Sequence, residues 1–143
     1  MNGEFCVAVH ALIYLHHCDR VVSSEELAKN ICTNPARVRK VMSRLKKAGL
    51  ITAREGGGNS GYRFCGNAEK IPLLAVMDAL QTRCVQMRWH SGNLDMDCLM
   101  ASGMSGLMDE IADDLEAHCR KRMKEISLAD LERKLFQGGK TGN

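Results

Sequence analysis

Residues 33–50 read TNPARVRKVMSRLKKAGL, and this stretch specifies a helix together with both of its ends. Asn34 is a residue type that caps helices, and Pro35 suits the first helical position, where an N–H would have no intrahelical partner. Gly49 can adopt the left-handed conformation that ends a helix. Apolar residues at three- and four-residue spacing predict one buried stripe. They are Val38, Val41, Met42 and Leu45.

The remaining surface of this helix is basic. Lysine and arginine residues crowd into three turns without an acidic neighbour, although like charges on a helix repel one another. They are Arg37, Arg39, Lys40, Arg44, Lys46 and Lys47. Such a helix favours an anionic partner, yet an ordinary solvated amphipathic helix has the same pattern. The sequence on either side of the helix distinguishes an anion-binding helix from an ordinary solvated one.

The flanks predict a winged helix-turn-helix. Ser23 and Glu26 have the spacing of a capping box, which predicts a short helix that a tight turn at residues 30–33 joins to the basic helix. Residues 50–54 and 62–65 have strand character, and the glycine-rich residues 55–61 join them as a hairpin, the wing. The glycine loop lacks the G-x-x-x-x-G-K-[ST] pattern and precedes a strand, so it does not indicate nucleotide binding.

Four further segments surround this unit. Residues 5–15 are almost continuously apolar and predict a helix buried from several sides, and residues 72–80 predict another. A long helix with a narrow apolar seam follows, and Ser127 caps a last short helix through residue 135. The seam favours pairing with a second copy of the chain, and packing on its own domain is the alternative. Its members are Met104, Met108, Ile111, Leu115 and Cys119.

The fold class is therefore mainly α with a small β-hairpin wing, carrying a long C-terminal dimerisation helix. The 143 residues, with a formal net charge of +3, suffice for one domain and an appended helix. We expect a winged-helix domain at residues 1–81, a sensor or linker loop at 82–97, dimerisation and closing helices at 98–136, and a disordered tail at 137–143. No apolar run could cross a bilayer and no leader is evident, so a cytoplasmic protein is expected.

The order of these parts resembles the IscR-type winged-helix transcription regulators, also called the Rrf-two family, and within it most closely the YwnA branch. The resemblance implies a bacterial homodimer, joined through residues 98–126, that binds a palindromic DNA operator and usually represses transcription. The segments that carry the resemblance are AVHAL at 8–12, SSEELA at 23–28, residues 33–50, the glycine hairpin ending at 61–62, residues 71–80 and SLADL at 127–131.

DNA contacts are expected from the basic helix and the wing. The first turn of the helix would read bases, because Asn34 can pair with adenine and Arg37 with guanine, while Arg54, Asn59 or Arg63 would reach backbone or minor groove from the wing. Each phosphate contact by a lysine or arginine should steepen the salt dependence of binding. The full candidate set is Ser24, Thr33, Asn34, Arg37, Arg39, Lys40, Ser43, Arg44, Arg54, Asn59, Tyr62 and Arg63.

The seven cysteines are scattered and contain no C-x-x-C pair, so neither a zinc ribbon nor a thioredoxin-like site is indicated. Members of the similar family hold an iron–sulfur cluster with three cysteines, each separated by five residues. Here Cys84 fits the first position, His90 and Met96 stand at the next two, and Cys98 follows. Cluster ligands are normally thiolates, so this set is incomplete and no cofactor is assigned.

Cys6 and His10 share one face of the first helix and could complete a mixed metal site with Cys84, His90 and Cys98. The alternative is that Cys6 is a small hydrophobic residue and His10 an ordinary helix histidine.

A thiol switch is the other sensing hypothesis, with Cys98, Cys84 and Cys32 as candidates in that order. Arg83 beside Cys84, and a helix start at Cys98, would stabilise thiolates, whereas unreactive cysteines are the alternative.

The sequence thus predicts a DNA-binding transcriptional regulator, a repressor controlled by cysteine redox chemistry. The alternatives are an iron–sulfur or metal-sensing regulator and a winged helix used only for protein contacts. An enzyme with a Cys and His pair is not indicated, because no oxyanion loop or pair of carboxylates accompanies it.

Overall fold

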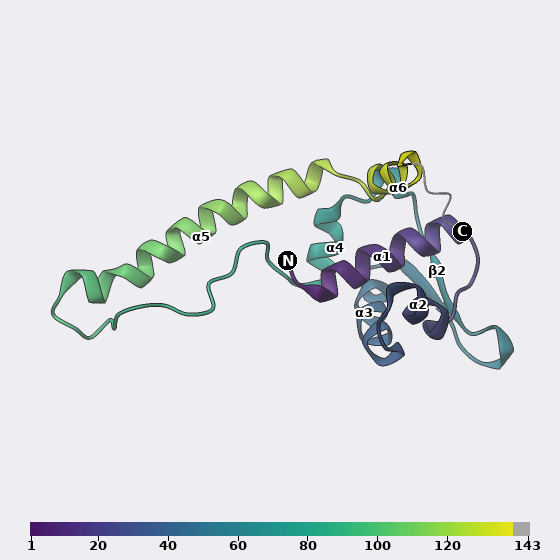
Figure 1. The fold of residues 1–143 in the computed structure, drawn as a ribbon, viewed down its shortest axis with the longest axis horizontal. Coiled ribbons are helices and arrows are strands. Elements are labelled where there is room, and N and C mark those ends of the chain that lie inside the picture. The colour runs from purple at the N-terminus through teal and green to yellow at the C-terminus, as the bar shows by residue number, and fades with distance from the viewer. Residues whose placement is uncertain (139–143) are drawn as a thin grey trace.

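The computed structural model describes residues 1–138, which form six α-helices and one two-stranded sheet (Figure 1). The tail predicted at 137–143 begins too early, since Gln137 belongs to the last helix, and residues 139–143 lie outside the described part. The elements are α1 (Gly3–Cys18), α2 (Ser24–Ile31), α3 (Pro35–Lys47), β1 (Ile51–Arg54), β2 (Gly61–Phe64), α4 (Leu73–Leu80), α5 (Leu99–Glu125) and α6 (Leu128–Gln137), with short 3-10 turns at Gly57–Asn59 and Ala68–Lys70.

The basic helix α3 has the ends that its sequence specifies. The Asn34 side-chain oxygen accepts a hydrogen bond from the Arg37 amide at 2.8 Å, and Pro35 takes the first helical position. Gly49 has φ 77°, the left-handed conformation that only glycine adopts without strain. Both ends are thus set by local residues, as predicted.

The wing is an antiparallel hairpin in which Ile51 pairs with Phe64 and Arg54 with Gly61. Its second strand also bridges to the segment before α2, because the Val22 and Tyr62 backbones exchange two hydrogen bonds of 2.9 and 2.8 Å. Gly61 lies against this bridge, where a Cβ would collide with the Val22 carbonyl oxygen. The wing is therefore fixed at its base to the start of α2.

The capping box predicted at Ser23 is only half formed. Ser23 Oγ accepts from the Glu26 amide at 3.1 Å, but the Glu26 carboxylate instead accepts from the Tyr14 hydroxyl at 2.7 Å and pairs with Arg20 at 2.6 Å. Glu26 therefore bonds to Tyr14 of α1 and Arg20 of the following turn, and not to the Ser23 backbone amide as a complete capping box requires. The complete box lies at Ser127 and Asp130, before α6.

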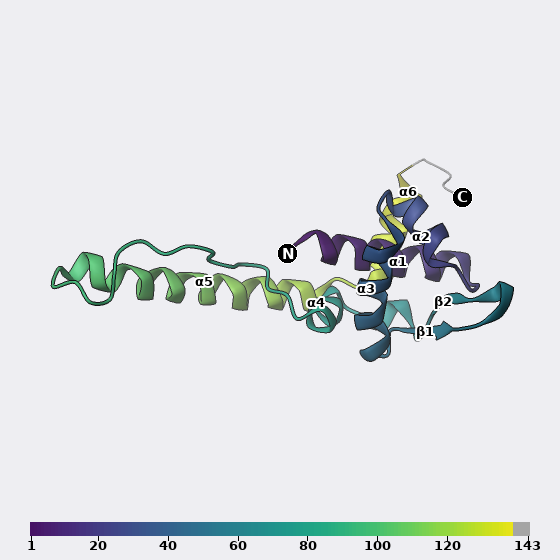
Figure 2. The ribbon, with the colours of Figure 1, turned by 90° about the horizontal axis from the view of Figure 1, so that it is seen from below.

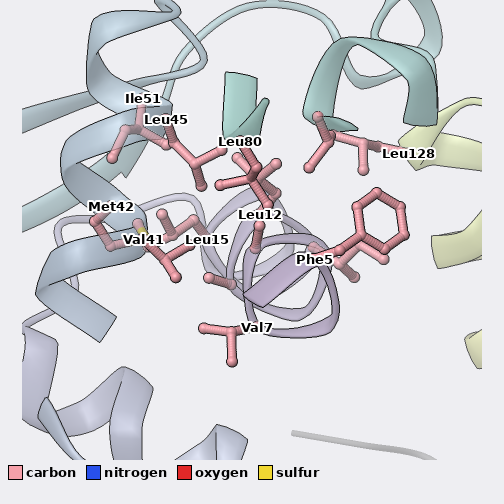
Figure 3. Packing of buried hydrophobic residues seen from close by; sticks show 14 of the residues in the cluster. Phe5, Val7, Leu12, Leu15, Val41, Met42, Leu45, Ile51, Leu80 and Leu128 are labelled. Carbon is pink, nitrogen blue, oxygen red and sulfur yellow. The ribbon is translucent and has the colours of Figure 1, made fainter. Parts of the chain in front are cut away.

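The core is built around α1, which is buried on most of its surface (Figure 3). Leu12 and Leu15 of α1 lie opposite Val41 and Leu45 of α3, so the buried stripe predicted on the basic helix packs against it. Helices α4 and α6 close the core on other sides of α1. This packing fixes the buried side of α3 and leaves its basic side outward.

Residues 82–98 run outward from α4 to the distal end of α5, and α5 returns alongside them toward the body (Figures 1 and 2). Several contacts hold the two together, and among them the Asn93 amide donates to the Ala101 carbonyl of α5 at 2.9 Å. The Val85 amide donates to Glu116 at 2.8 Å, Arg83 pairs with Asp113 at 2.8 Å and His90 with Asp109 at 2.6 Å.

This arrangement adds to the predicted seam a difference between its two edges, one of which packs on the chain itself while the other is exposed. Met108, Cys119 and Met123 lie on the side that faces the chain's own linker and α4, with Ala112 and Glu116 buried there. The other apolar face stays exposed and consists of Met104, Leu107, Ile111 and Leu115.

Candidate nucleic-acid interface

The outer face of α3, which we define as Ala36, Lys40, Ser43 and Lys47, lies opposite its buried stripe. These residues recur at three- and four-residue spacing, and all four are exposed. No acidic residue lies on α3 itself, and Lys40 and Lys47 give the face its positive charge. It can present lysine and serine donors to a polyanion.

A groove of about 320 Å³ runs between the start of α2, the side of α3 and the wing. Arg39 projects into it from α3 and donates to Ser24 Oγ at 3.3 Å, with Glu25 a further 3.9 Å contact. Arg54 lines the groove from the end of β1, and Tyr62 from β2. A tyrosine hydroxyl is protonated at neutral pH and can donate, and burial raises the pKa of Tyr62 above its ordinary value. Four predicted residues are therefore brought together in this groove.

Lys40 and Arg44 are partly neutralised by a residue that the sequence did not indicate. Glu4 of α1 pairs with Lys40 at 3.0 Å and lies 3.9 Å from Arg44. The hydrogen bond from Lys40 holds the pKa of the Glu4 carboxyl below its usual range, against the opposing effect of burial. Lys40 is still largely exposed, so it can exchange Glu4 for a phosphate.

The Arg44 side chain is held by a contact within the protein. Its guanidinium donates to the Leu80 carbonyl at the end of α4, at 2.9 Å. That oxygen is one of the last carbonyls of a helix, which lack intrahelical donors. Arg44 thus joins α3 to α4, and it is separated from the groove that holds Arg39.

The first turn of α3 offers fewer free groups than its sequence suggests. Asn34 uses its side-chain oxygen for the cap, so a two-point contact to adenine would break the helix end. Its amide nitrogen is the group left for a base. Arg37 is exposed, and its guanidinium lies beside Gly3 at the start of α1, while Thr33 is half-buried with its amide bonded to the Ala28 carbonyl.

On the wing, Asn59 is exposed in the turn between the two strands. Arg63 lies at the opposite end of β2 from that turn, and it donates to the Asp19 carboxylate at 3.2 Å. Arg63 therefore ties the wing to the end of α1, whereas Asn59 and Arg54 are free to approach a ligand.

The candidate metal ligands do not form a set within one chain. His10 bonds to Asn30 at 2.7 Å beside the exposed Cys6, whereas His90 bonds to Asp109 on α5. In residues 1–138 no three His, Cys, Asp or Glu side chains come together to hold a metal ion. The donor chemistry of the linker, with a histidine and a methionine in place of two thiolates, also does not fit an iron–sulfur cluster.

The three predicted thiol candidates lie in different environments. Cys32 is exposed in the turn between α2 and α3, with φ 63°, and Cys98 is exposed at the N-cap of α5 as predicted. Cys84 is half-buried, and burial raises the pKa of its thiol, with smaller contributions from Glu116 and Cys119. The expected thiolate stabilisation at Cys84 is wrong, because Arg83 turns to Asp113.

The structure also identifies residues that sequence reasoning missed. Glu4, Glu116 and Asp113 each contact a predicted site residue or its neighbour across 30 or more positions. The sequence carries no signal for such pairs, since charge alone does not select among the many possible partners. Lys47 could have been found from its spacing to Lys40.

An exposed basic helix in a helix-turn-helix, with a hairpin beside it and a shared groove between them, defines a winged-helix DNA-binding protein. Residues 1–134 match the Rrf2 family, described as "Iron-dependent Transcriptional regulator". The chain therefore belongs to the Rrf2 family of DNA-binding transcriptional regulators, which are not enzymes.

Relatives agree with this assignment. The chain is 29% identical over 136 residues to YwnA of Bacillus subtilis (strain 168), assigned as an HTH-type transcriptional regulator, and covers 99% of it with 95% of its own length. A Lactobacillus plantarum protein assigned as a transcriptional regulator has 28% identity and a TM-score of 0.83, with 97% of this chain and 93% of that one covered. IscR of T. potens shares the fold, with 14% identity, a TM-score of 0.71 and coverage of 100% and 93%.

No helix within residues 1–138 is both long and apolar enough to span a bilayer.

Proposed function

We propose that this protein is a repressor that binds a palindromic operator as a homodimer and is controlled by cysteine oxidation. The observation that carries the proposal is the set of exposed basic side chains on the outer face of α3 and in the adjoining groove to the wing. Lys40, Lys47, Arg39 and Arg54 hold phosphates, and these contacts position the protein without reading sequence.

Base recognition belongs to the first turn of α3. Arg37 is long enough to reach the guanine edge, where an arginine makes two hydrogen bonds. The Asn34 amide nitrogen can donate to a base while its oxygen keeps the helix cap. Ser43 lies two turns further along the outer face and adds a short donor.

The homodimer is supported by the exposed apolar face of α5. Leu107 and Ile111 are 55% and 50% exposed, and Met104 and Leu115 continue the same face. Exposed apolar residues repeated at helical spacing, here over residues 104–115, are typical of a helix that pairs with a second copy. Two-fold symmetry would place two α3 helices about one duplex turn apart, which is why the operator is a palindrome.

Redox control is supported by where the thiols lie. Cys32 occupies the turn that orients α3, and Cys84 and Cys98 flank the linker along α5. A change at any of them alters an element that positions the reading helices. Of these, Cys98 and Cys32 have exposed side chains.

A mobility-shift titration on the region upstream of the protein's own gene tests the proposal, with a shuffled duplex of equal length and composition as control. We expect specific binding, protection of two inverted half-sites about 10 base pairs apart from centre to centre, and less transcript in an in vitro transcription assay. Equal affinity for both duplexes would contradict sequence-specific regulation. No affinity for either would indicate a winged helix used for protein contacts.

A further inference from the structure

Cys84, just after α4, lies against a face of α5 that carries a second thiol. The residues on both sides of Cys84 are fixed to this helix, Arg83 to Asp113 and the Val85 amide to Glu116, each at 2.8 Å. Cys119 is one turn beyond Glu116 on the same face and is half-buried. These two contacts place Cys84 beside the face of α5 that carries Cys119.

The thiols themselves are neighbours. The Cys84 sulfur lies 3.5 Å from the Met77 sulfur of α4. Burial raises the pKa of the Cys84 thiol, the charge of Glu116 raises it further, and the neighbouring Cys119 has a smaller effect in the same direction. Three sulfur atoms of α4, the linker and α5 thus share one partly buried site.

A buried carboxyl group completes the site. Glu116 is only 6% exposed, and its Oε2 accepts from the Val85 amide. Its Oε1 is buried and has no hydrogen-bond partner among the described residues. An unpartnered buried carboxylate oxygen costs free energy, and this one is a hydrogen-bond acceptor placed beside the thiols.

We propose that Cys84 and Cys119 form a reversible disulfide bond when a hydroperoxide oxidises the protein, and that this bond lowers operator affinity. This inference rests on the proposed DNA-binding function. It assigns the regulation to a cysteine pair that includes Cys119, which the sequence pattern placed in the apolar seam and not among the redox candidates.

The chemistry balances with the hydroperoxide as the oxidant. The Cys119 thiolate attacks one peroxide oxygen, the O–O bond breaks, and a sulfenic acid and an alcohol are formed. The Cys84 sulfur then attacks the Cys119 sulfur, the S–O bond breaks, and hydroxide leaves as water with the proton from Cys84. Two thiols lose two hydrogens, and the hydroperoxide becomes an alcohol and water.

The site is connected to the DNA-binding surface through α4. Cys84 follows Leu80 by four residues, and the Leu80 carbonyl is the acceptor for Arg44 of α3. Met77, the sulfur neighbour of Cys84, lies one turn earlier in α4. Drawing Cys84 toward Cys119 moves it away from Met77 and pulls on the end of α4 that holds α3.

The test begins with the full-length protein, reduced and then treated with tert-butyl hydroperoxide. Digestion with trypsin and a glutamate-specific protease places Cys84 in residues 84–88 and Cys119 in 117–120, whereas Cys98 stays in 89–110. Mass spectrometry without reductant should find residues 84–88 joined to 117–120, and reductant should separate them. Operator affinity should fall about tenfold or more and recover on reduction, a typical coupling between two sites.

Variants separate this inference from the proposed function. Cys119→Ser and Cys84→Ser should bind the operator like the wild type when reduced and should keep that affinity after peroxide, while Cys98→Ser should still respond. If the cross-linked peptide is missing, or forms without a change in affinity, the inference is overturned while DNA binding stands. If the reduced wild type binds no operator, the proposed function itself fails.

Discussion

Asn34 shows how one side chain can limit what a recognition helix does. Its oxygen caps α3 by accepting from the Arg37 amide, and only its nitrogen remains for DNA. The residue that begins the helix is therefore also one that the operator would contact. Stability and recognition can be separated at this position by choosing a replacement that caps but lacks the amide.

We predict that Asn34→Ala lowers the free energy of unfolding by about 1 kcal/mol, since it removes the cap acceptor. Asn34→Ser should stay within a few tenths of a kcal/mol of the wild type, roughly the spread among good capping residues. Urea unfolding followed by circular dichroism measures both. Equal unfolding midpoints for the two variants would mean that the side-chain cap contributes nothing to stability.

At the residue scale, contacts between residues close in the sequence could be predicted, whereas contacts between distant residues could not. The caps of α3 and α6 were predictable, because a cap and its target are three residues apart. The pairs of Glu4 with Lys40 and of Arg44 with the Leu80 carbonyl were not, because the sequence does not say which distant group meets a given charge. The bond to the Leu80 carbonyl is the contact that holds Arg44 away from the residues of the groove.

At the scale of elements, most helices and the hairpin could be predicted, and the faces of α5 could not. Periodicity locates an apolar residue on a helix but does not say what covers it. Met108 and Cys119 face the chain's own linker and α4, whereas Ile111 and Leu115 face outward. The linker that divides the two faces is itself without periodicity, so its path along α5 has no signal in the sequence.

Helices α1 and α2 are joined by a polar network, and we predict that its contribution to folding stability depends on pH. The Tyr14 hydroxyl donates to Glu26, and chiefly this bond, with burial, raises the pKa of Tyr14 to about 12. Because the raised pKa belongs to the folded state, the network's contribution to stability is complete below the unfolded value of about 10. It is lost as the pH rises from there through about 12.

Phenolate absorbance during an alkaline titration checks this prediction. The folded protein should show little phenolate at pH about 10, where a free tyrosine is half ionised. The step near 12 should disappear in Tyr14→Phe, which leaves Tyr62 as the remaining tyrosine. Half of the phenolate signal appearing by pH about 10, with the circular dichroism still native, would contradict the network.

At the scale of the whole molecule, a DNA-binding body carries an arm that no other part of the described chain covers on one side (Figure 2). Helix α5 has 27 residues, so the arm is about 40 Å long. Its exposed apolar face is the surface on which the proposed dimer depends.

We predict that Ile111→Glu converts a dimer to a monomer, because two carboxylates would have to be buried in the paired apolar face. Sedimentation velocity at matched concentrations measures the change. Ala117→Glu is the control, since it adds the same charge at an exposed position of α5 away from that face. A wild type that sediments as a monomer, or an unaffected Ile111→Glu variant, would argue against pairing through α5.

The central proposal is that Arg39 on the groove side of α3 and Arg54 on the wing hold DNA phosphates together. The most direct measurement is the operator affinity of the wild type, Arg39→Ala, Arg54→Ala and the double variant over a series of salt concentrations, with Lys121→Ala on α5 as control. Each phosphate contact contributes about 0.9 to the slope of log affinity against log salt, so single variants should lose about 0.9 and the double variant about 1.8. The control should keep the wild-type slope. Identical slopes for all five proteins would contradict the account.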